Sequence, residues 1–226
     1  MKIFIDTADL GEIRRAARAG LIDGITTNPS LMAKVVGDAN VADYMQEVAD
    51  SVDGPVSLEV LALDADGMVS QGQDLARFGD NVVIKVPLTE DGLVACKRLR
   101  SEGIGVNVTL CFSAPQALLA AKAGATFISP FVGRLDDISH SGMELIAQIR
   151  EIYDNYGFDT EILVASIRHP LHFVEAAMIG ADVATVPPAV LWKFLQHPLT
   201  DSGIEAFLKD AQKANLEVPS TEEAKA

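Results

Sequence analysis

Short apolar runs alternate with longer amphipathic runs from the first residues of the chain almost to its end. Short, largely β-branched runs are typical of buried parallel strands, and apolar positions three and four apart are typical of helices. Eight expected strands cover residues 2–7, 22–28, 56–62, 81–87, 104–111, 126–131, 160–166 and 181–187. Seven expected helices lie between them, at residues 9–20, 40–52, 65–79, 90–103, 113–124, 141–157 and 169–180.

This alternation predicts an α/β fold, with a parallel sheet inside and helices outside. Eight units favour a closed (β/α)8 TIM barrel over an open doubly wound sheet. The first strand leads into "FIDTADLGEI", which lacks the glycine fingerprint of a dinucleotide-binding sheet. No interior linker interrupts the pattern, so residues 1–226 are expected to form a single barrel domain.

An additional C-terminal helix is expected over residues 201–215, with its cap at Asp201 or Ser202. Its apolar positions form one stripe, made by Ile204, Phe207, Leu208 and Ala211. Two arrangements remain open: the helix packs on its own barrel, or it docks on a neighbouring subunit. Residues 217–226 are polar and are expected to be frayed.

The net charge of −14 argues against general nucleic-acid binding, which rests on neutralising phosphates. An anionic ligand would need a local basic cluster in such an acidic chain.

The two cysteines, Cys96 and Cys111, lack metal or redox spacing and are expected to be reduced thiols of a cytoplasmic protein. The N-terminus lacks the apolar core of a signal peptide, and no segment approaches the roughly 18 apolar residues of a membrane span.

Side chains along a strand alternate between its two faces, and the polar residues of the expected strands follow that alternation. Lys85 shares its face with Val83 and Pro87. The other polar residues in phase with the barrel interior are Asp6, Thr26, Asn28, Glu59, Asn107, Thr109, Ser129 and Ser166. Most lie in the C-terminal halves of their strands, where barrels of this type build active sites. Any one of them alone could instead cap a helix or satisfy loop backbone.

A lysine in a water-poor cavity can become neutral and attack a carbonyl to form a Schiff base, which makes Lys85 a candidate nucleophile. Glu59 is placed to pass protons through a water held by Thr109, and Asp6 to take the proton of a substrate hydroxyl. The amides of Asn28 and Asn107 suit hydroxyl recognition. The structural alternative is a barrel lysine ion-paired with Glu59 or Asp6, which is compatible with a resting enzyme.

Basic residues occur beyond two of the expected strands. "SPFVGRLDD" places Arg134 in a loop, and "SIRHP" places Ser166 and Arg168 together. Two guanidiniums and a hydroxyl from adjacent loops predict a phosphate clamp. The alternative is that Arg134 pairs with Asp136 or Asp137.

Two histidines, His169 and His172, are three residues apart on the expected helix 169–180. Nothing near them in the sequence completes a metal-binding set. A structural role is therefore favoured for both.

Together, "FIDTAD", "GITTNPSL", "SLEV", "VVIKVPLT", "GVNVTLCFS", "FISPFVGRLDD", "ASIRHP" and "GADVATVP" resemble the small, short-chain transaldolases of the transaldolase/fructose-6-phosphate aldolase family. The resemblance runs from Met1 to about Leu208. It implies a class I Schiff-base enzyme on a (β/α)8 barrel, without metal or organic cofactor. It also implies homo-oligomers, commonly pentamers or decamers, whose C-terminal helix lies on a neighbour.

The resemblance also assigns roles to individual residues. Lys85 would form the Schiff base, Asp6 and Glu59 the acid/base pair, and Thr109 would hold the catalytic water. The sugar site would be lined by Thr26, Asn28, Asn107 and Ser129, and the phosphate site by Arg134, Ser166 and Arg168.

Two positions separate the activities of this family. Its aldolase-type members tend to carry glutamine on the third strand and tyrosine on the sixth, whereas this chain has Glu59 and Phe131. This pattern resembles a transaldolase of the pentose phosphate pathway. Such an enzyme transfers a dihydroxyacetone unit from sedoheptulose 7-phosphate or fructose 6-phosphate to glyceraldehyde 3-phosphate or erythrose 4-phosphate. The alternatives are a fructose-6-phosphate aldolase using free dihydroxyacetone and a non-catalytic sugar-phosphate-binding barrel.

Overall fold

The computed structural model describes residues 1–216 and 218. The chain divides into two compact units, Met1–Leu191 and a second that begins at Trp192. The first unit contains the eight described strands and the candidate site.

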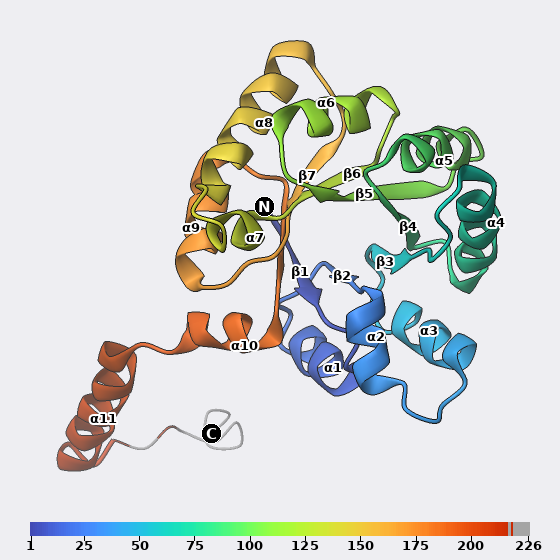
Figure 1. Ribbon diagram of the computed structural model, residues 1–226. Coiled ribbons are helices and arrows are strands. Elements are labelled where there is room, and N and C mark those ends of the chain that lie inside the picture. Colours follow the sequence, from blue (N-terminus) through green and yellow to red (C-terminus); the bar gives the residue numbers. More distant parts are fainter. Residues whose placement is uncertain (217, 219–226) are drawn as a thin grey trace, which may run out of the picture. The chain divides into compact units, whose positions relative to one another are not determined.

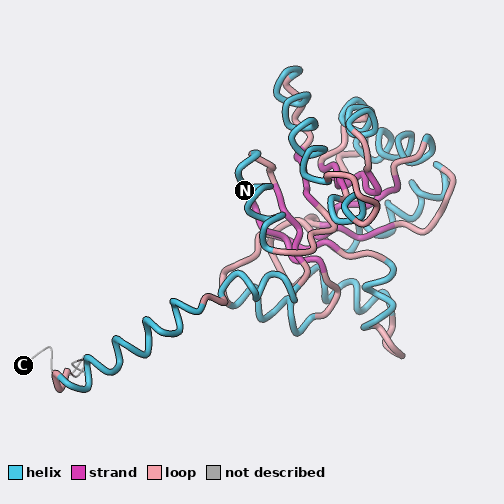
Figure 2. The backbone as a smooth tube through the Cα atoms, turned by 60° about the vertical axis from the view of Figure 1, so that its left-hand side comes forward, coloured by secondary structure: helices cyan, strands magenta, loops and turns pink. Residues whose placement is uncertain are grey.

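The strands of the first unit form a closed parallel barrel in sequence order, β1 to β8, with β8 paired to β1. Figure 1 shows the helices around these strands, and Figure 2 shows the strands in magenta inside them. The strands are β1 Lys2–Asp6, β2 Gly24–Thr26, β3 Val56–Glu59, β4 Val82–Pro87, β5 Gly105–Cys111, β6 Phe127–Pro130, β7 Glu161–Val164 and β8 Val183–Val186. The predicted (β/α)8 barrel is confirmed, with strands shorter than expected at most ends.

Helices follow the strands, and most begin at a side-chain cap such as Asp9, Asn40, Asp64, Thr89, Ser113 or Ser141. The longer helices of the barrel are α1 Leu10–Arg18, α3 Val41–Ala49, α4 Ala65–Leu75, α5 Glu90–Ser101, α6 Ala114–Lys122, α8 Gly142–Tyr156 and α9 Pro170–Ile179. A 3-10 turn, η1 Ala76–Phe78, continues α4. These helices agree with the seven expected from the sequence.

Three short helices were not expected: α2 Pro29–Val35, α7 Val132–Asp136 and α10 Pro188–Leu191. Each begins directly after a strand or its first loop residues, and each is shorter than the window of about 11 residues over which a helical pattern can be recognised. Two of them start with proline, which suits the first helical position because it has no N–H to leave unpaired. In α2 the cap is Asn28, whose Oδ1 accepts the N–H of Leu31 at 3.0 Å.

A hydrophobic plug fills the interior of the barrel. It consists of Phe4, Val83, Phe127, Leu163, Ala165 and Val183, with Phe131 packed against it. The Phe4 and Phe127 rings meet edge to face at 5.9 Å between centroids, a favourable aromatic geometry. Most plug residues precede a polar residue by two positions on the same strand, so the plug forms the floor of the polar layer.

The second unit contains a 3-10 turn, η2 Trp192–Leu195, and α11 Pro198–Lys213. The predicted start of the C-terminal helix was wrong, because α11 begins before Asp201 and Ser202. Pro198 occupies its first turn, and the Nδ1 of His197 accepts the N–H of Leu199 at 3.2 Å, which caps the helix earlier. The expected frayed tail, residues 217–226, lies outside the described residues except for Val218.

Removing the fully buried Leu163 side chain from the plug by Leu163→Ala should lower the free energy of unfolding by about 2–5 kcal/mol, because it leaves a cavity. The same change at Leu119, which is 54% exposed on α6, should cost no more than about 0.5 kcal/mol. Chemical denaturation of both variants measures the difference. Equal losses would contradict the assignment of Leu163 to the barrel core.

Candidate active site

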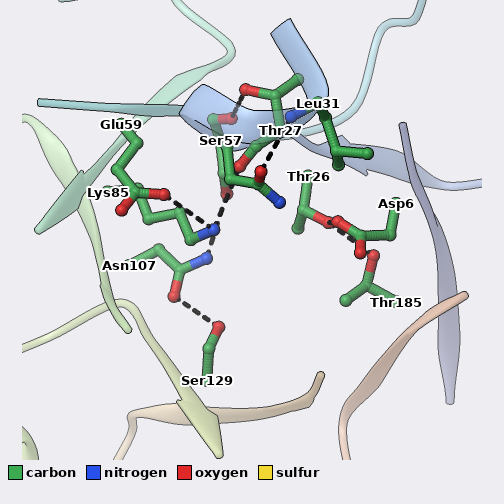
Figure 3. Close-up of polar contacts among 11 residues, drawn as sticks. Asp6, Thr26, Thr27, Leu31, Ser57, Glu59, Lys85, Asn107, Ser129 and Thr185 are labelled. Atoms are coloured by element: carbon green, nitrogen blue, oxygen red, sulfur yellow. Dashed lines mark hydrogen bonds and ion pairs between the residues drawn. The ribbon is translucent and has the colours of Figure 1, made fainter. Parts of the chain in front are cut away.

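Lys85 lies at the centre of a buried polar layer above the plug. Its side chain is only 6% exposed, and its Nζ donates to the carbonyl of Thr27 at 3.0 Å. The same nitrogen lies 3.1 Å from Oε2 of Glu59, its neighbour across the β3–β4 ladder (Figure 3). The predicted interior position of Lys85 is confirmed. The resting protein also contains the ion pair with Glu59 that the sequence left open.

A second polar group joins β1, β2 and β8. The Thr26 hydroxyl donates to Oδ1 of Asp6 at 2.8 Å and lies 2.6 Å from the Thr185 hydroxyl (Figure 3). Because Thr26 has one hydroxyl hydrogen and gives it to Asp6, Thr185 must donate to Thr26. Burial raises the pKa of the Asp6 carboxyl, and the charge of Lys85 and the Thr26 hydrogen bond offset part of that increase.

Thr185 is a site residue that the sequence reasoning missed. It is buried on β8, in phase with Val183 of the plug and two residues before Pro187. The alternation that selects Lys85 on its strand selects Thr185 by the same rule, so the signal was present in the sequence.

Asn107 and Ser129 form a third polar group on β5 and β6. Nδ2 of Asn107 donates to the Ser57 hydroxyl at 3.1 Å, and its Oδ1 accepts from Ser129 at 2.7 Å (Figure 3). Asn107 is fully buried and does not reach the cavity wall. Its amide therefore braces Ser129, which does line the cavity.

Thr109 lies further along β5, opposite Pro87 of β4. Its hydroxyl is buried and has no protein partner among the described residues. The β5–β6 register shifts between Val108 and Cys111, the stretch that contains Thr109, and Leu110 adopts a left-handed backbone with φ 61°. A buried hydroxyl without a protein partner is costly unless it binds a water or a ligand, so Thr109 remains suited to either.

The basic residues come from the ends of β6 and β7. Arg134 was expected in a loop, but it lies on α7, with its guanidinium carbon 4.8 Å from the centroid of the Phe131 ring.

The loop after β7 carries Ser166, which has a left-handed backbone with φ 61°, and Arg168 two residues later. Asp137 pairs with Arg168 at 3.0 Å, and within the described chain no ion pair joins Arg134 to Asp136 or Asp137. Such an exposed pair stabilises little and can yield to a bound anion.

One cavity of about 160 Å³ opens at the carboxyl ends of the strands. It brings together many of the predicted site residues, namely Asp6, Thr26, Asn28, Lys85, Ser129, Phe131, Arg134, Ser166 and Arg168. Glu59 instead lines an adjacent, more apolar cavity of about 170 Å³ with Met32 and Val41. Glu59 therefore contacts Lys85 from behind the main cavity, whereas Asp6 lines the cavity itself.

Neither cysteine belongs to this layer. Both are buried free thiols, and burial raises the pKa of Cys96 and of Cys111 to about 12.

Over residues 1–216 and 218, no three His, Cys, Asp or Glu side chains are grouped so as to hold a metal ion. No helix in that same part of the chain is long and apolar enough to cross a membrane.

A (β/α)8 barrel with a lysine, carboxylates and arginines converging at the carboxyl ends of its strands has the architecture of a barrel enzyme. Residues 3–225 match the family described as Transaldolase/Fructose-6-phosphate aldolase. The chain belongs to this family.

Relatives support the same assignment. A probable transaldolase of Hyphomonas neptunium is 62% identical over 96% of this chain and 100% of its own length. A probable transaldolase of Nitrosopumilus maritimus is 60% identical over 97% of this chain and 98% of its own length. A third, from Chelativorans sp., is 60% identical over 96% of this chain and all of its own.

The raised pKa of Asp6 predicts a pH-dependent stability. The folded protein holds the Asp6 proton more tightly than the unfolded chain, so this contribution is complete below about pH 4 and is lost as pH rises through the folded pKa. Asp6→Asn removes the ionisation. The variant should therefore melt at a higher temperature than the wild type at pH 8, with the gain vanishing near pH 4.

Thermal unfolding at several pH values measures this gain. Asp38→Asn, at an exposed aspartate, is the matched control and should show no such trend. A gain of the same size at every pH would show that it does not arise from ionisation of Asp6.

Proposed function

We propose that the protein is a transaldolase that transfers a dihydroxyacetone unit between sugar phosphates through a Schiff base on Lys85. The observation that carries the proposal is the buried Lys85 amine, 3.1 Å from the Glu59 carboxylate and in the wall of the same cavity as Asp6. The donors are fructose 6-phosphate or sedoheptulose 7-phosphate, and the acceptors are erythrose 4-phosphate or glyceraldehyde 3-phosphate. This exchange belongs to the pentose phosphate pathway.

In the first half-reaction, Lys85 gives a proton to Glu59 and attacks the C2 carbonyl of the donor. The carbinolamine loses water to form an iminium, with Glu59 returning the proton, and the Thr109 hydroxyl holds the water. Asp6 then takes the proton of the C4 hydroxyl. The C3–C4 bond breaks, its electrons pass to the iminium, and an aldose phosphate leaves while an enamine stays on Lys85.

In the second half-reaction, the enamine carbon attacks the acceptor aldehyde, and Asp6 returns its proton to the new hydroxyl. Hydrolysis of the iminium releases the product ketose. The raised pKa of Asp6 suits this reversible role, because a base whose pKa lies nearer the working pH can both accept and return a proton. The second proton carrier, Glu59, contacts Lys85 without lining the main cavity, which separates the two acid/base roles in space.

The phosphate of each substrate would lie between Arg134, Ser166 and Arg168. Guanidinium groups hold phosphates through charge-assisted hydrogen bonds, and in a chain of net charge −14 such a local cluster is required. The hydroxyls of the bound sugar would face Ser129, Thr26 and the amide nitrogen of Asn28, since Oδ1 of Asn28 is used to cap α2.

Phe131 favours transfer over free release of dihydroxyacetone. Its ring lines the cavity and packs edge to face on Phe112, at 5.8 Å between centroids. A phenylalanine adds no hydroxyl to the water network that hydrolyses the Schiff base, so the adduct persists until an acceptor arrives. The phenylalanine at position 131 therefore makes fructose-6-phosphate aldolase the second candidate function.

A homo-oligomer, a pentamer or decamer by family resemblance, is part of the same proposal. Ile204, Phe207 and Leu208 of α11 are all more than half exposed in the single chain. An exposed apolar stripe on a surface helix is typical of a subunit contact. Light scattering measures the mass of the assembly, and a monomer would contradict this part.

Borohydride trapping tests the Schiff base. Reduction of the enzyme with fructose 6-phosphate should leave a stable secondary amine on Lys85, located by peptide mass spectrometry. Lys85→Met, which keeps the apolar stem of the side chain, should abolish both trapping and transfer while the barrel remains folded by circular dichroism. Trapping on another lysine would contradict the mechanism. Binding of fructose 6-phosphate without adduct or exchange would indicate a non-catalytic sugar-phosphate-binding barrel.

Phe131→Tyr tests the distinction between transfer and aldol cleavage. The added phenol should raise the release of free dihydroxyacetone from fructose 6-phosphate relative to transfer to erythrose 4-phosphate, because it supplies a hydroxyl for hydrolysis. A coupled assay with and without the acceptor measures the ratio. Phe112→Tyr is the matched control, since Phe112 packs on Phe131 but does not line the cavity. An unchanged ratio in Phe131→Tyr would refute the argument.

A further inference from the structure

One buried histidine lies behind the basic end of the cavity and has no part in the proposed chemistry. His172 of α9 is 4% exposed and does not line the cavity. Its Nε2 lies 2.7 Å from Oδ2 of Asp136, the last residue of α7, and its Nδ1 accepts the backbone N–H of Arg168 at 3.3 Å. A single ring thus connects the helix that carries Arg134 with the loop that carries Ser166 and Arg168.

These hydrogen bonds fix the protonation of the ring. The N–H of Arg168 can only donate, so Nδ1 must carry a lone pair, and Nε2–H must donate to the Asp136 carboxylate. Burial lowers the pKa of His172. His169, whose ring is tilted by 40° against it at 3.8 Å between centroids, lowers the pKa further, while Asp136 and Glu175 oppose the change. The neutral tautomer that the geometry requires is therefore also favoured electrostatically.

The need for such a link follows from the size of α7. Five residues are too few for a helix to be stable by itself. Its N-terminal end is held by backbone bonds, because the N–H groups of Val132 and Gly133 donate to the carbonyls of Ala165 and Ser166 at 3.1 and 3.0 Å. Its C-terminal end is held to the same loop through Asp136 and His172. Arg134 lies between these two attachments.

We propose that His172 and Asp136 are positioning residues that set the spacing of the Arg134 and Arg168 guanidiniums for the phosphate of the substrate. The inference rests on the proposed phosphate clamp and assigns the pair no contact with substrate. Loss of the hydrogen bond between His172 and Asp136 should weaken binding of phosphorylated donors and leave the chemistry at Lys85 unchanged.

Asp136→Asn is an informative isosteric variant. Oδ1 of Asp136 accepts the N–H of Gly142 at 2.9 Å, so an amide at this position must keep its oxygen there and turn its NH2 towards His172. Nε2 would then have to accept, and the ring proton would move to Nδ1, against the N–H of Arg168. The link should break although the side chain keeps its size.

The experiment compares His172→Gln, Asp136→Asn and the double variant in steady-state transfer, with fructose 6-phosphate and with fructose as donors. Each single variant should raise KM for fructose 6-phosphate about tenfold, the change expected for one net hydrogen bond, with kcat nearly unchanged. The double variant should be no worse than either single one, because all three break the same link. With fructose, kcat/KM should not change.

The matched control is His140→Gln, at an exposed histidine beyond α7, which should behave as wild type. An unchanged KM for fructose 6-phosphate in folded variants would overturn the inference, as would an equal loss with both donors, which indicates a packing role. A wild-type enzyme that does not prefer fructose 6-phosphate to fructose would refute the phosphate clamp itself, and the inference with it. If the wild type prefers fructose 6-phosphate to fructose and both single variants keep that preference, the positioning role of His172 and Asp136 is refuted while the phosphate clamp stands.

Discussion

The structure depends on one geometric constraint, the period of two along each strand of a closed barrel. On β1, β4, β6 and β8 a residue of the apolar plug and a residue of the polar layer above it are successive interior residues. Phe4 precedes Asp6, Val83 precedes Lys85, Phe127 precedes Ser129 and Val183 precedes Thr185. The plug thereby places buried apolar side chains directly below the amine, and the main cavity opens above it at the carboxyl ends of the strands.

Burying charge in this layer has a cost that the layer only partly offsets. The Lys85 ammonium has a carboxylate and a carbonyl as partners, and their attraction recovers only part of the desolvation free energy that burying the charges costs. Asp6 has two threonine hydroxyls behind it and an elevated pKa. A barrel built only for stability would use apolar residues at these positions, so their presence is itself an argument that the site acts on a ligand.

The sequence predicts the barrel and most of the site because both follow from local periodicity. Strand parity alone selects Lys85, and the same rule applies to Thr185, which was overlooked. The helix carrying Arg134 could not be predicted, because its five residues are held by contacts with the distant loop 165–168 rather than by their own pattern. For the same reason the Asp136–His172 contact, which spans 36 residues, has no signal in a single sequence. The early start of α11 follows from a proline and a histidine whose capping geometry is not apparent before the fold is known.

Ser166 has a consequence for attempts to make this barrel more stable. Its left-handed backbone, φ 61°, is strained for any residue with a Cβ and costs about 1 kcal/mol, whereas glycine would adopt it freely. A search for stabilising substitutions would therefore select glycine at this position. The hydroxyl that would be removed lines the cavity beside Arg168. Heat resistance and anion recognition thus compete for a single residue, and a thermostable design should leave this loop unchanged and seek its gains elsewhere in the chain.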